Sequence, residues 1–593
     1  MNDLPRWDLA SIYTDIDSNE FRNDMKSIVA HSEDIANLLD NRDKKTLFVD
    51  LLIQIITSYE VMLDTFETLN AFTQALLTVD TTDKKAMQGV HDVSEIGLLV
   101  HSNHVKFVSF LADNKDEVYA SIKDHPYLNQ YHYVLTELIN EKLHMMSFAE
   151  EALAADLVRS GAEAFSRLHE AITSTSSIVV DQKSGEKKSA NELRALAFHE
   201  EREVRKEAYY NELELWKSQE TPLSYALNGV KGAAISLYTK RNYTDPLENA
   251  LIQSRIDRGT LDAMICAIED NLSVFHRYFR AKAHHLGLEV LSFYDLFAPI
   301  GSVDTTFSFS DASRIITKEF SSFHPAMGAF AKSAFANNWI DAPSVYGKVG
   351  GAYCTSFPLR KETRILCNYD GSFDAVSTVA HELGHAYHDY ITKDESALLR
   401  HYPMTLAETA SIFSQFIVFK GLLEKSSKNE SIALIEGFIQ DASQTCLDIL
   451  SRFYFEREVF ERRAMGELSG EEFCEIMKDS QLKTYQDALN SDELHPYMWA
   501  VKGHYYSVDL PFYNFPYAFG QLFSLGLYTE YEKHKEGFSE KFDALLNYTG
   551  KDEAAKVTLS ASCDITTDKF WTESIGVIRS YVDQFCSLVG YEG

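Results

Sequence analysis

Residues 381–390, HELGHAYHDY, contain two histidines four positions apart, with a glutamate directly after the first. On an α-helix, positions i and i+4 lie one turn apart on the same face. His381 and His385 can therefore direct two imidazoles at one ion, while Glu382 lies about 100° around the helix from His381. A hydrolytic zinc site needs this arrangement, because two neutral imidazoles bind the metal and a carboxylate stands beside it without ligating. The motif thus predicts metal-assisted hydrolysis.

The motif alone leaves an ordinary helix as the alternative. In a chain with 20 histidines among 593 residues, H-E-x-x-H arises by chance about 0.05 times. The extended pattern H-E-x-x-H-x-x-G-x-x-H is not met, because His388 stands where it has glycine and Ile391 where it has histidine. We interpret His388 as a solvated or core histidine. A third ligand must therefore come from elsewhere in the chain.

Glu408 is the best candidate for the third ligand. Residues 404–419, MTLAETASIFSQFIVF, predict an apolar helix on which Glu408 shares its i, i+4 row with Ile412 and Phe416. A lone carboxylate on an apolar stripe is costly unless something pairs with it, and a zinc ion would be such a partner. The alternative is a surface glutamate favoured by the helix dipole. Glu395 lies in a polar segment and is a weaker candidate.

Helical periodicity dominates the rest of the chain. Apolar residues recur every three or four positions in several long segments, which predicts helices at 43–80, 135–172, 190–240, 404–462 and 570–588. Strand-like pieces are few, namely Ser177–Val180, Gly350–Thr355 and Arg364–Asn368. The sequence therefore predicts a mainly α, multi-lobed protein with a small β-sheet beside the HExxH helix.

A turn and a cap are expected just before the HExxH helix. Asp370-Gly371 turns the chain after the last strand-like piece, and Ser372 or Asp374 can cap the helix that follows. A larger break falls at residues 181–190, DQKSGEKKSA, where Ser189 and the glutamate three residues later have capping-box spacing. We divide the chain there into a helical N-terminal lobe, 1–190, and a larger C-terminal part, 191–593, which contains the HExxH motif and is the candidate catalytic domain.

Composition limits the kinds of partner that the protein is expected to bind and the cellular compartment in which it is expected. The net charge of −32 would repel nucleic acid and anionic membrane surfaces. The N-terminal residues lack the basic and apolar regions of a signal peptide, and the apolar stretch 510–529 contains too many polar residues and prolines for a membrane span. The seven cysteines are scattered and form no C-x-x-C pair. A cytoplasmic chain with reduced thiols is expected, with no nucleic-acid or membrane partner.

An ordered set of segments resembles one known family, the oligoendopeptidase F branch of the thimet-oligopeptidase-like zinc metallopeptidases. The resemblance runs from residue 6 to about residue 520 and is much more specific than the zinc motif alone. It is carried by RWDLASIY near the start, SFYDLFAP (292–299), YGKVGGAYCTS (346–356), HELGHAYH (381–388), LAETAS (406–411) and HYYSVDLPFYNFPYAFG (504–520).

The resemblance implies roles for the matching residues. One zinc ion per chain would be held by His381, His385 and Glu408, with Glu382 as general base. His504, Tyr513 and Tyr517 would stand near the substrate, Tyr517 by a looser match because Pro516 lies between the tyrosines. Without the family match, core packing would be the simpler interpretation of these aromatic residues.

The resemblance also implies how the substrate binds. Gly350 and Gly351 lack side chains, so a peptide backbone could approach closely, and the strand through Ala352 and Tyr353 could offer its edge to an extended peptide. A buried hairpin is the alternative for this segment. A deep channel between helical lobes is implied, which would admit only short, unfolded oligopeptides.

The resulting hypothesis is a zinc-dependent endopeptidase that hydrolyses internal bonds of oligopeptides. Two alternatives share the helical build, a zinc carboxypeptidase and a non-catalytic peptide-binding protein. A structural zinc site is disfavoured, because such sites are rich in cysteine and no cysteine lies within ten residues of the motif on either side. Cleavage preference, peptide length limit, physiological substrate and oligomeric state are not predicted.

Overall fold

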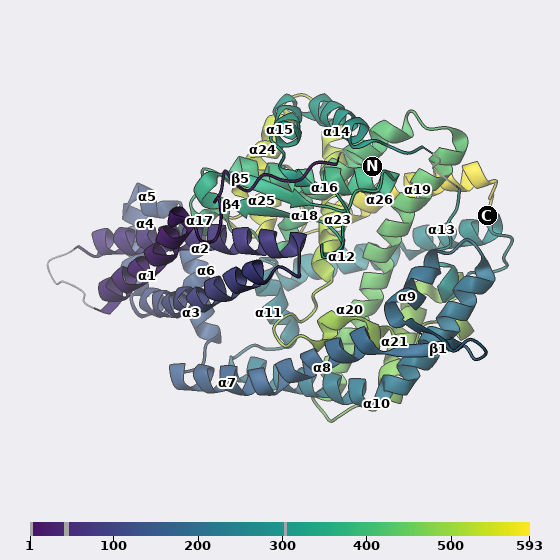
Figure 1. The fold of residues 1–593 in the computed structure, drawn as a ribbon, viewed down its shortest axis with the longest axis horizontal. Helices are drawn as coiled ribbons and strands as arrows, with labels where there is room; N and C mark the ends of the chain where they lie inside the picture. Colours follow the sequence, from purple (N-terminus) through teal and green to yellow (C-terminus); the bar gives the residue numbers. More distant parts are fainter. Residues whose placement is uncertain (1–3, 41–46, 302–304) are drawn as a thin grey trace. The chain divides into compact units, whose positions relative to one another are not determined.

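The structure is a computed structural model that describes residues 4–40, 47–301 and 305–593 (Figure 1). Helices dominate it, as the sequence predicts, and the sheets are small. The chain forms two compact units, each built from three separate segments. The first unit comprises Met1–Leu143, Thr305–Glu424 and Glu530–Cys563, and the second comprises His144–Asp304, Lys425–Thr529 and Asp564–Gly593.

The first unit combines a helical N-terminal segment with the helices and sheet around the HExxH motif. Helices α1, α2 and α3 pack against one another, and α2 also packs against strand β4. Its elements are α1 Asn19–Asp40, α2 Phe48–Val79, α3 Lys84–Asp113, α4 Lys115–Asp124, α5 Pro126–Asn129, α6 His132–Glu141, α14 Phe309–Phe323, α15 Pro325–Ala336, β3 Ile340–Asp341, β4 Tyr353–Phe357, β5 Glu362–Leu366, α16 Phe373–Thr392, α17 Ala397–Arg400, α18 Met404–Leu423, α24 Phe538–Tyr548 and α25 Ala554–Ser560.

The second unit is built around the long helix α10. A π-helical turn, η5 Gln444–Asp448, directly precedes α20. The elements of this unit are α7 Phe148–Ser160, α8 Ala162–Thr175, β1 Ser177–Asp181, β2 Glu186–Ser189, α9 Ala190–Ala195, α10 Arg202–Lys240, α11 Pro246–Gln253, α12 Arg258–Asp270, α13 Leu272–His285, α19 Lys428–Ser443, α20 Ile449–Arg463, α21 Gly470–Tyr485, α22 Met498–Val501 and α26 Asp568–Val589. The division between the units falls inside α23, Phe515–Lys533.

The sheet of the first unit has the order β3-β5-β4. Strand β5 pairs with β3 in parallel and with β4 antiparallel, with Ile365 opposite both Ile340 and Cys354. Strand β4 is therefore an edge strand, and no further strand pairs with it in the described part of the chain. Helix α16, which follows β5, packs on both β4 and β5, so the sheet lies beside the HExxH helix as predicted.

The predicted elements agree with the structure in type and differ in their boundaries. Residues 43–46 of the first predicted helix lie outside the described residues, and the rest corresponds to α2. The polar break at 181–190 contains a strand, because Glu186–Ser189 pairs with β1 as a hairpin. The capping box of Ser189 and Glu192 is present at the start of α9. The division near residue 190 falls within the second unit and stays a prediction about the chain.

Helix α18 is unusually apolar. Among the described residues, it is the one helix that is long and apolar enough to cross a membrane, judged by length and composition alone. Of its most apolar window, 61% is buried inside the protein. The helix contains Glu408 near its start and packs along α16. The apolar side chains of α18 are therefore mostly covered by other elements of the first unit.

Candidate metal centre

The local sequence explains why α16 begins where it does. Gly371 adopts φ +87°, a left-handed conformation that glycine accepts without steric cost. The hydroxyl of Ser372 then accepts a hydrogen bond from the backbone N–H of Ala375 at 3.1 Å, which caps the helix. Val379 and Leu383 are fully buried and fix the face that α16 turns toward the core. The predicted cap by Ser372 is confirmed.

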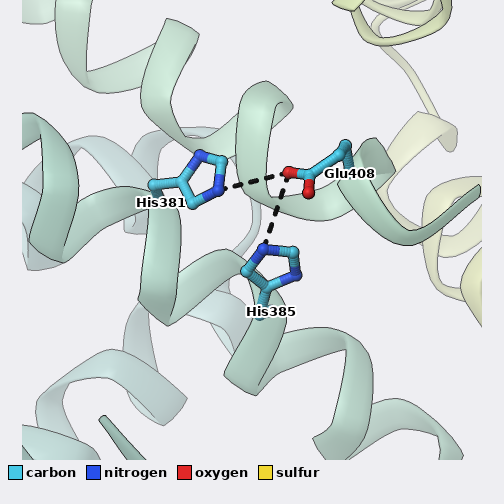
Figure 2. Close-up of side chains that lie close together, drawn as sticks. All are labelled: His381, His385 and Glu408. Carbon is cyan, nitrogen blue, oxygen red and sulfur yellow. Dashed lines mark ion pairs between the residues drawn. The ribbon is translucent and has the colours of Figure 1, made fainter. Parts of the chain in front are cut away.

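The two motif histidines and Glu408 converge on one point (Figure 2). The imidazoles lie on successive turns of α16, and Nε2 of His381 and of His385 lie 3.2 and 3.6 Å from Oε2 of Glu408. All three ligand atoms lie within 4.8 Å of one another. The ring planes of the two histidines are nearly perpendicular, at 78°. The structure thus brings together the three predicted ligands from two helices.

The spacing of these atoms suits a tetrahedral cation. Zinc bonds of about 2.1 Å at tetrahedral angles separate neighbouring ligand atoms by about 3.4 Å. The measured separations of 3.2 and 3.6 Å lie close to that value. The donor set, two imidazole nitrogens and one carboxylate oxygen, is one that catalytic zinc sites use. The residues present therefore fit a metal ion.

Gly384 allows α18 to lie directly against the motif. A Cβ atom built on Gly384 would lie 2.5 Å from the carbonyl oxygen of Ala410 and 2.5 Å from Cα of Ser411. No real side chain fits at such distances, so only glycine permits this approach of the two helix backbones. The close approach places Glu408, one turn before Ser411, opposite both histidines. The glycine inside HELGH is thus a packing residue of the metal centre.

Two further side chains of α18 hold the ligands in place, and the sequence analysis did not identify them. His381 Nδ1 lies 3.1 Å from Oε1 of Gln415, so an Nδ1–H donor leaves Nε2 free for a metal. The hydroxyl of Ser411 donates to Oε2 of Glu408 at 2.8 Å. Glu408, Ser411 and Gln415 are spaced i, i+3 and i+7, which is one helix face. That polar row within an apolar helix was the available signal.

Burial and charge set the protonation of the centre. Burial raises the pKa of Glu382 to about 7. Burial also acts to raise the pKa of Glu408, but the hydrogen bond from His381 and the neighbouring imidazoles outweigh it and lower that pKa to about 2. Burial lowers the pKa of His385 to about 4. Glu382 is not part of the ligand group, and the charges of His381 and Glu408 both act on its pKa, so its carboxylate lies near the centre.

The remaining histidine and glutamate candidates have other partners. His388 is fully buried, stacks on Tyr402 at 4.1 Å between ring centroids, and places Nε2 2.8 Å from the hydroxyl of Thr549. It is a core histidine, as one of the two interpretations held. Glu395 pairs with Lys551 at 2.9 Å. Neither residue belongs to the ligand group.

The predicted substrate residues of the aromatic segment lie together in the second unit. The hydroxyls of Tyr513 and Tyr517 are 2.6 Å apart, and the rings of His504 and Tyr513 are 5.8 Å apart between centroids. Tyr517 lies in the first turn of α23, one turn beyond Tyr513. The structure therefore brings these three side chains together, while their role toward a substrate stays a prediction.

The Gly-rich segment before β4 is open at the predicted positions. A Cβ atom at Gly350 or Gly351 would meet nothing within 4 Å, and Gly351 adopts φ +79°. Asn368 donates to the carbonyl oxygens of Val349 and Gly351 at 3.0 and 2.9 Å, which fixes the segment against the end of β5. Beyond Ala352, the hydroxyl of Tyr353 bonds to Thr78 at 2.6 Å, which ties β4 to α2.

The fold and the ligand cluster define the class of this protein as a mainly helical metallopeptidase of the HExxH type, with the candidate third ligand on a second helix. Comparison with known proteins then places it more narrowly. The chain belongs to peptidase family M3, whose sequence profile matches residues 195–577, and a second profile described as Oligopeptidase F matches residues 110–176.

Relatives and solved structures agree with this assignment over nearly the full length. An oligoendopeptidase F homolog of Lactococcus lactis is 24% identical over 98% of this chain and 97% of its own. Oligopeptidase PepF of Bacillus subtilis is 22% identical over 92% and 84%. The crystal structure of oligoendopeptidase-F from Enterococcus faecium has the same fold, with a TM-score of 0.70 at 17% identity over 96% of this chain and 99% of its own. The predicted family is therefore confirmed.

Proposed function

We propose that this protein is a zinc-dependent endopeptidase that hydrolyses internal bonds of short, unfolded oligopeptides. The observation that supports the proposal best is the convergence of His381, His385 and Glu408 on one point, with Glu382 beside it and outside the ligand group. Three protein ligands with one position open to solvent or substrate distinguish catalytic zinc sites from closed structural ones.

Each residue has a defined task in the proposed reaction. When bound, zinc supplies Lewis acidity, which polarises the scissile carbonyl and lowers the pKa of water at the open position toward about 7. Glu382 accepts a proton from the attacking water and passes it to the leaving amine. The family resemblance implies that His504 and Tyr513 donate hydrogen bonds to the carbonyl oxygen as negative charge develops on it.

Main-chain recognition is the proposed mode of peptide binding. Strand β4 lies at the edge of its sheet, and Gly350 and Gly351 next to it leave room for another backbone. An extended peptide that pairs with this edge would be bound by its amides, independently of most of its side chains. A channel limiting the substrate to short, unfolded peptides is part of the proposal and rests on the family resemblance.

The proposal is tested by separating metal binding from turnover. Glu382→Gln should retain the metal and lose about 10²–10⁴ in kcat, because the general base is gone. His381→Ala should lose both metal and activity. Metal content is measured by elemental analysis after dialysis, and cleavage by a quenched-fluorescent peptide with mass spectrometry of its products. Glu395→Gln is the matched control, because this glutamate pairs with Lys551 away from the ligands.

Specific results would defeat the proposal or replace it. Full activity in Glu382→Gln would show that Glu382 is not the general base. Cleavage that persists in the presence of a chelator would show that the reaction does not need a metal. Products shortened one or two residues at a time from the C-terminus would favour the zinc carboxypeptidase alternative, and no cleavage of any oligopeptide would favour a peptide-binding protein. The cytoplasmic location and the absence of nucleic-acid and membrane partners stay predictions from the sequence.

A further inference from the structure

A chain of polar contacts in the second unit ends on His504. Nη1 of Arg452, on α20, donates to Oδ1 of Asn514 at 3.3 Å. Nδ2 of Asn514 lies 2.6 Å from Nε2 of His504. No hydrogen bond joins Nδ1 of His504 to another residue of this unit in the part of the chain that the structure describes. The contacts therefore involve Nε2 of His504 and leave Nδ1 without a hydrogen-bond partner among the described residues of this unit.

These contacts determine which nitrogen of His504 carries the proton. Arginine has no acceptor, so the atom of Asn514 facing Arg452 must be its carbonyl oxygen. The amide nitrogen then faces His504, and an amide nitrogen can only donate. Nε2 of His504 must accept this hydrogen bond with its lone pair. The ring is consequently neutral, with its proton on Nδ1.

The surrounding charges act in the same direction. Burial lowers the pKa of His504 to about 2, aided by the positive charges of Arg452, Lys231 and Lys502. A protonated ring would also place an Nε2–H against the N–H of Asn514, with both groups donating. The imidazolium form is therefore excluded by hydrogen bonding and by charge together.

The partners of His504 are themselves fixed. The Asp448 carboxylate pairs with Arg452, and Asp448 closes the π-helical turn that precedes α20. Phe512 has φ +54°, a strained conformation for a bulky residue, and its N–H donates to Oε2 of Glu456 at 3.1 Å. Glu456 also pairs with buried Lys231 at 2.6 Å. The loop that carries Asn514 is thus held by Phe512 on its N-terminal side, and Arg452, which faces Asn514, is held by Asp448.

We propose that Asn514, oriented by Arg452, is a positioning residue that fixes His504 as a neutral hydrogen-bond donor through Nδ1. The inference rests on the proposed peptidase function, in which His504 donates to the carbonyl oxygen of the substrate. It adds that His504 takes no part as a proton-transferring acid. It also assigns to Asn514 and Arg452 an effect on catalysis that passes entirely through the imidazole.

The variant Asn514→Asp reverses the proposed hydrogen bond. A carboxylate can accept from Nε2–H while still accepting from Arg452, so the proton should move from Nδ1 to Nε2. We expect kcat/KM for a fluorogenic peptide to fall by about 100-fold, the cost of one lost oxyanion donor. Metal content should be unchanged. Asn429→Asp, at an exposed position of α19, adds the same charge and should leave kcat/KM unaltered.

A double-mutant cycle distinguishes positioning from general damage. In a His504→Gln background, Asn514→Asp should change kcat/KM by less than about threefold, because residues acting through one group are not additive. An equal loss in both backgrounds would overturn the proposal. So would wild-type kcat/KM in the Asn514→Asp single variant.

Nitrogen NMR of protein with isotopically labelled histidine determines the tautomer of His504 without an activity assay. The resonance of His504 is assigned by its disappearance in His504→Gln. A protonated Nδ1 and unprotonated Nε2 in the wild-type chain would support the proposal, and a protonated Nε2 would overturn it, even if Asn514→Asp failed to fold. Because this measurement needs no substrate, a chain that cleaves no peptide would defeat the peptidase function while leaving the tautomer to be judged separately.

Discussion

At the scale of single residues, the ligands depend on partners that do not touch the metal position. Gln415 accepts from Nδ1 of His381, and Ser411 donates to Glu408. Such outer partners orient the ligand rings and fix their tautomers. With a metal bound, a neutral His381 with its proton on Nδ1 would present Nε2 as the ligand atom. Ligand identity is therefore only part of what the centre requires.

Removal of the hydrogen-bond acceptor at residue 415 should weaken metal binding without abolishing it. Gln415→Leu is expected to lower metal affinity by about 10–100-fold, because the His381 ring loses the partner that orients it. Gln415→Glu keeps an acceptor in place and should bind metal at least as tightly as the wild type. Competition with a chromophoric chelator measures both affinities. Equal affinity in the leucine and glutamate variants would show that the contact has no effect on binding.

The sequence predicted the cluster of candidate site residues better than its surroundings. His381, Glu382 and His385 follow from helix geometry, and Glu408 from the cost of a carboxylate on an apolar stripe. Gln415 was missed because its role depends on which face of α18 meets α16. Asn514 was missed for a similar reason, since its partner Arg452 is 62 positions away. The polar row on α18 marked a face of that helix but not its partner, because contacts between distant segments leave no periodic signal.

At the scale of elements, the approach of α16 to α18 depends on Gly384. Gly384→Ala is expected to force the helices apart and to destabilise the fold by about 1–3 kcal/mol, the usual cost of overpacking. Metal affinity should fall as well, because Glu408 moves with α18. Thermal unfolding and chelator competition measure the two effects.

A second glycine provides the control for helix propensity. A Cβ atom at Gly576, inside α26, would meet nothing within 4 Å. Gly576→Ala should therefore leave metal affinity unchanged and raise stability by about 0.4–1 kcal/mol. If Gly384→Ala were equally stabilising and retained full metal affinity, the close contact would not be a requirement of the site.

In the five segments where periodicity predicted helices, it did not predict how long each helix runs. The predicted helix at 404–462 is divided into α18, α19, a π-helical turn and α20. Each shorter helix keeps its own apolar face, so the pattern continues across the breaks. Strand β2 was missed because Glu186, Lys187 and Lys188 are polar, and a two-stranded hairpin at the surface needs no apolar alternation.

At the scale of the whole molecule, neither unit is continuous in sequence. The first unit needs residues before 143 to complete structure formed after 305. Arg364, only 1% exposed, donates to the carbonyl oxygen of Asp8 and to the hydroxyl of Ser11, both at 2.7 Å. Arg400 pairs with Asp64 and Glu67 on α2. Two arginines near the HExxH region thus depend on the N-terminal segment.

A fragment of residues 191–593 is therefore expected not to fold as a stable domain. Without the N-terminal segment, Arg364 loses acceptors for its buried guanidinium, and each unsatisfied buried group costs about 1–3 kcal/mol or more. Thermal unfolding followed by circular dichroism should show no cooperative transition in the fragment, in contrast to the full chain. A fragment that unfolds cooperatively and binds metal would instead support the linear division at residue 190.

The interleaved segments also set the order of events during synthesis. Domains that are continuous in sequence can fold one after another as they leave the ribosome. Here the first unit lacks its last segment until Cys563 has been made, and the second unit lacks its own until the residues after Asp564 have been made. The nascent polypeptide consequently carries an incomplete HExxH region through most of translation. Hydrolytic competence should then arise only after residue 563 has been made, which would keep an immature peptidase from acting on other nascent chains.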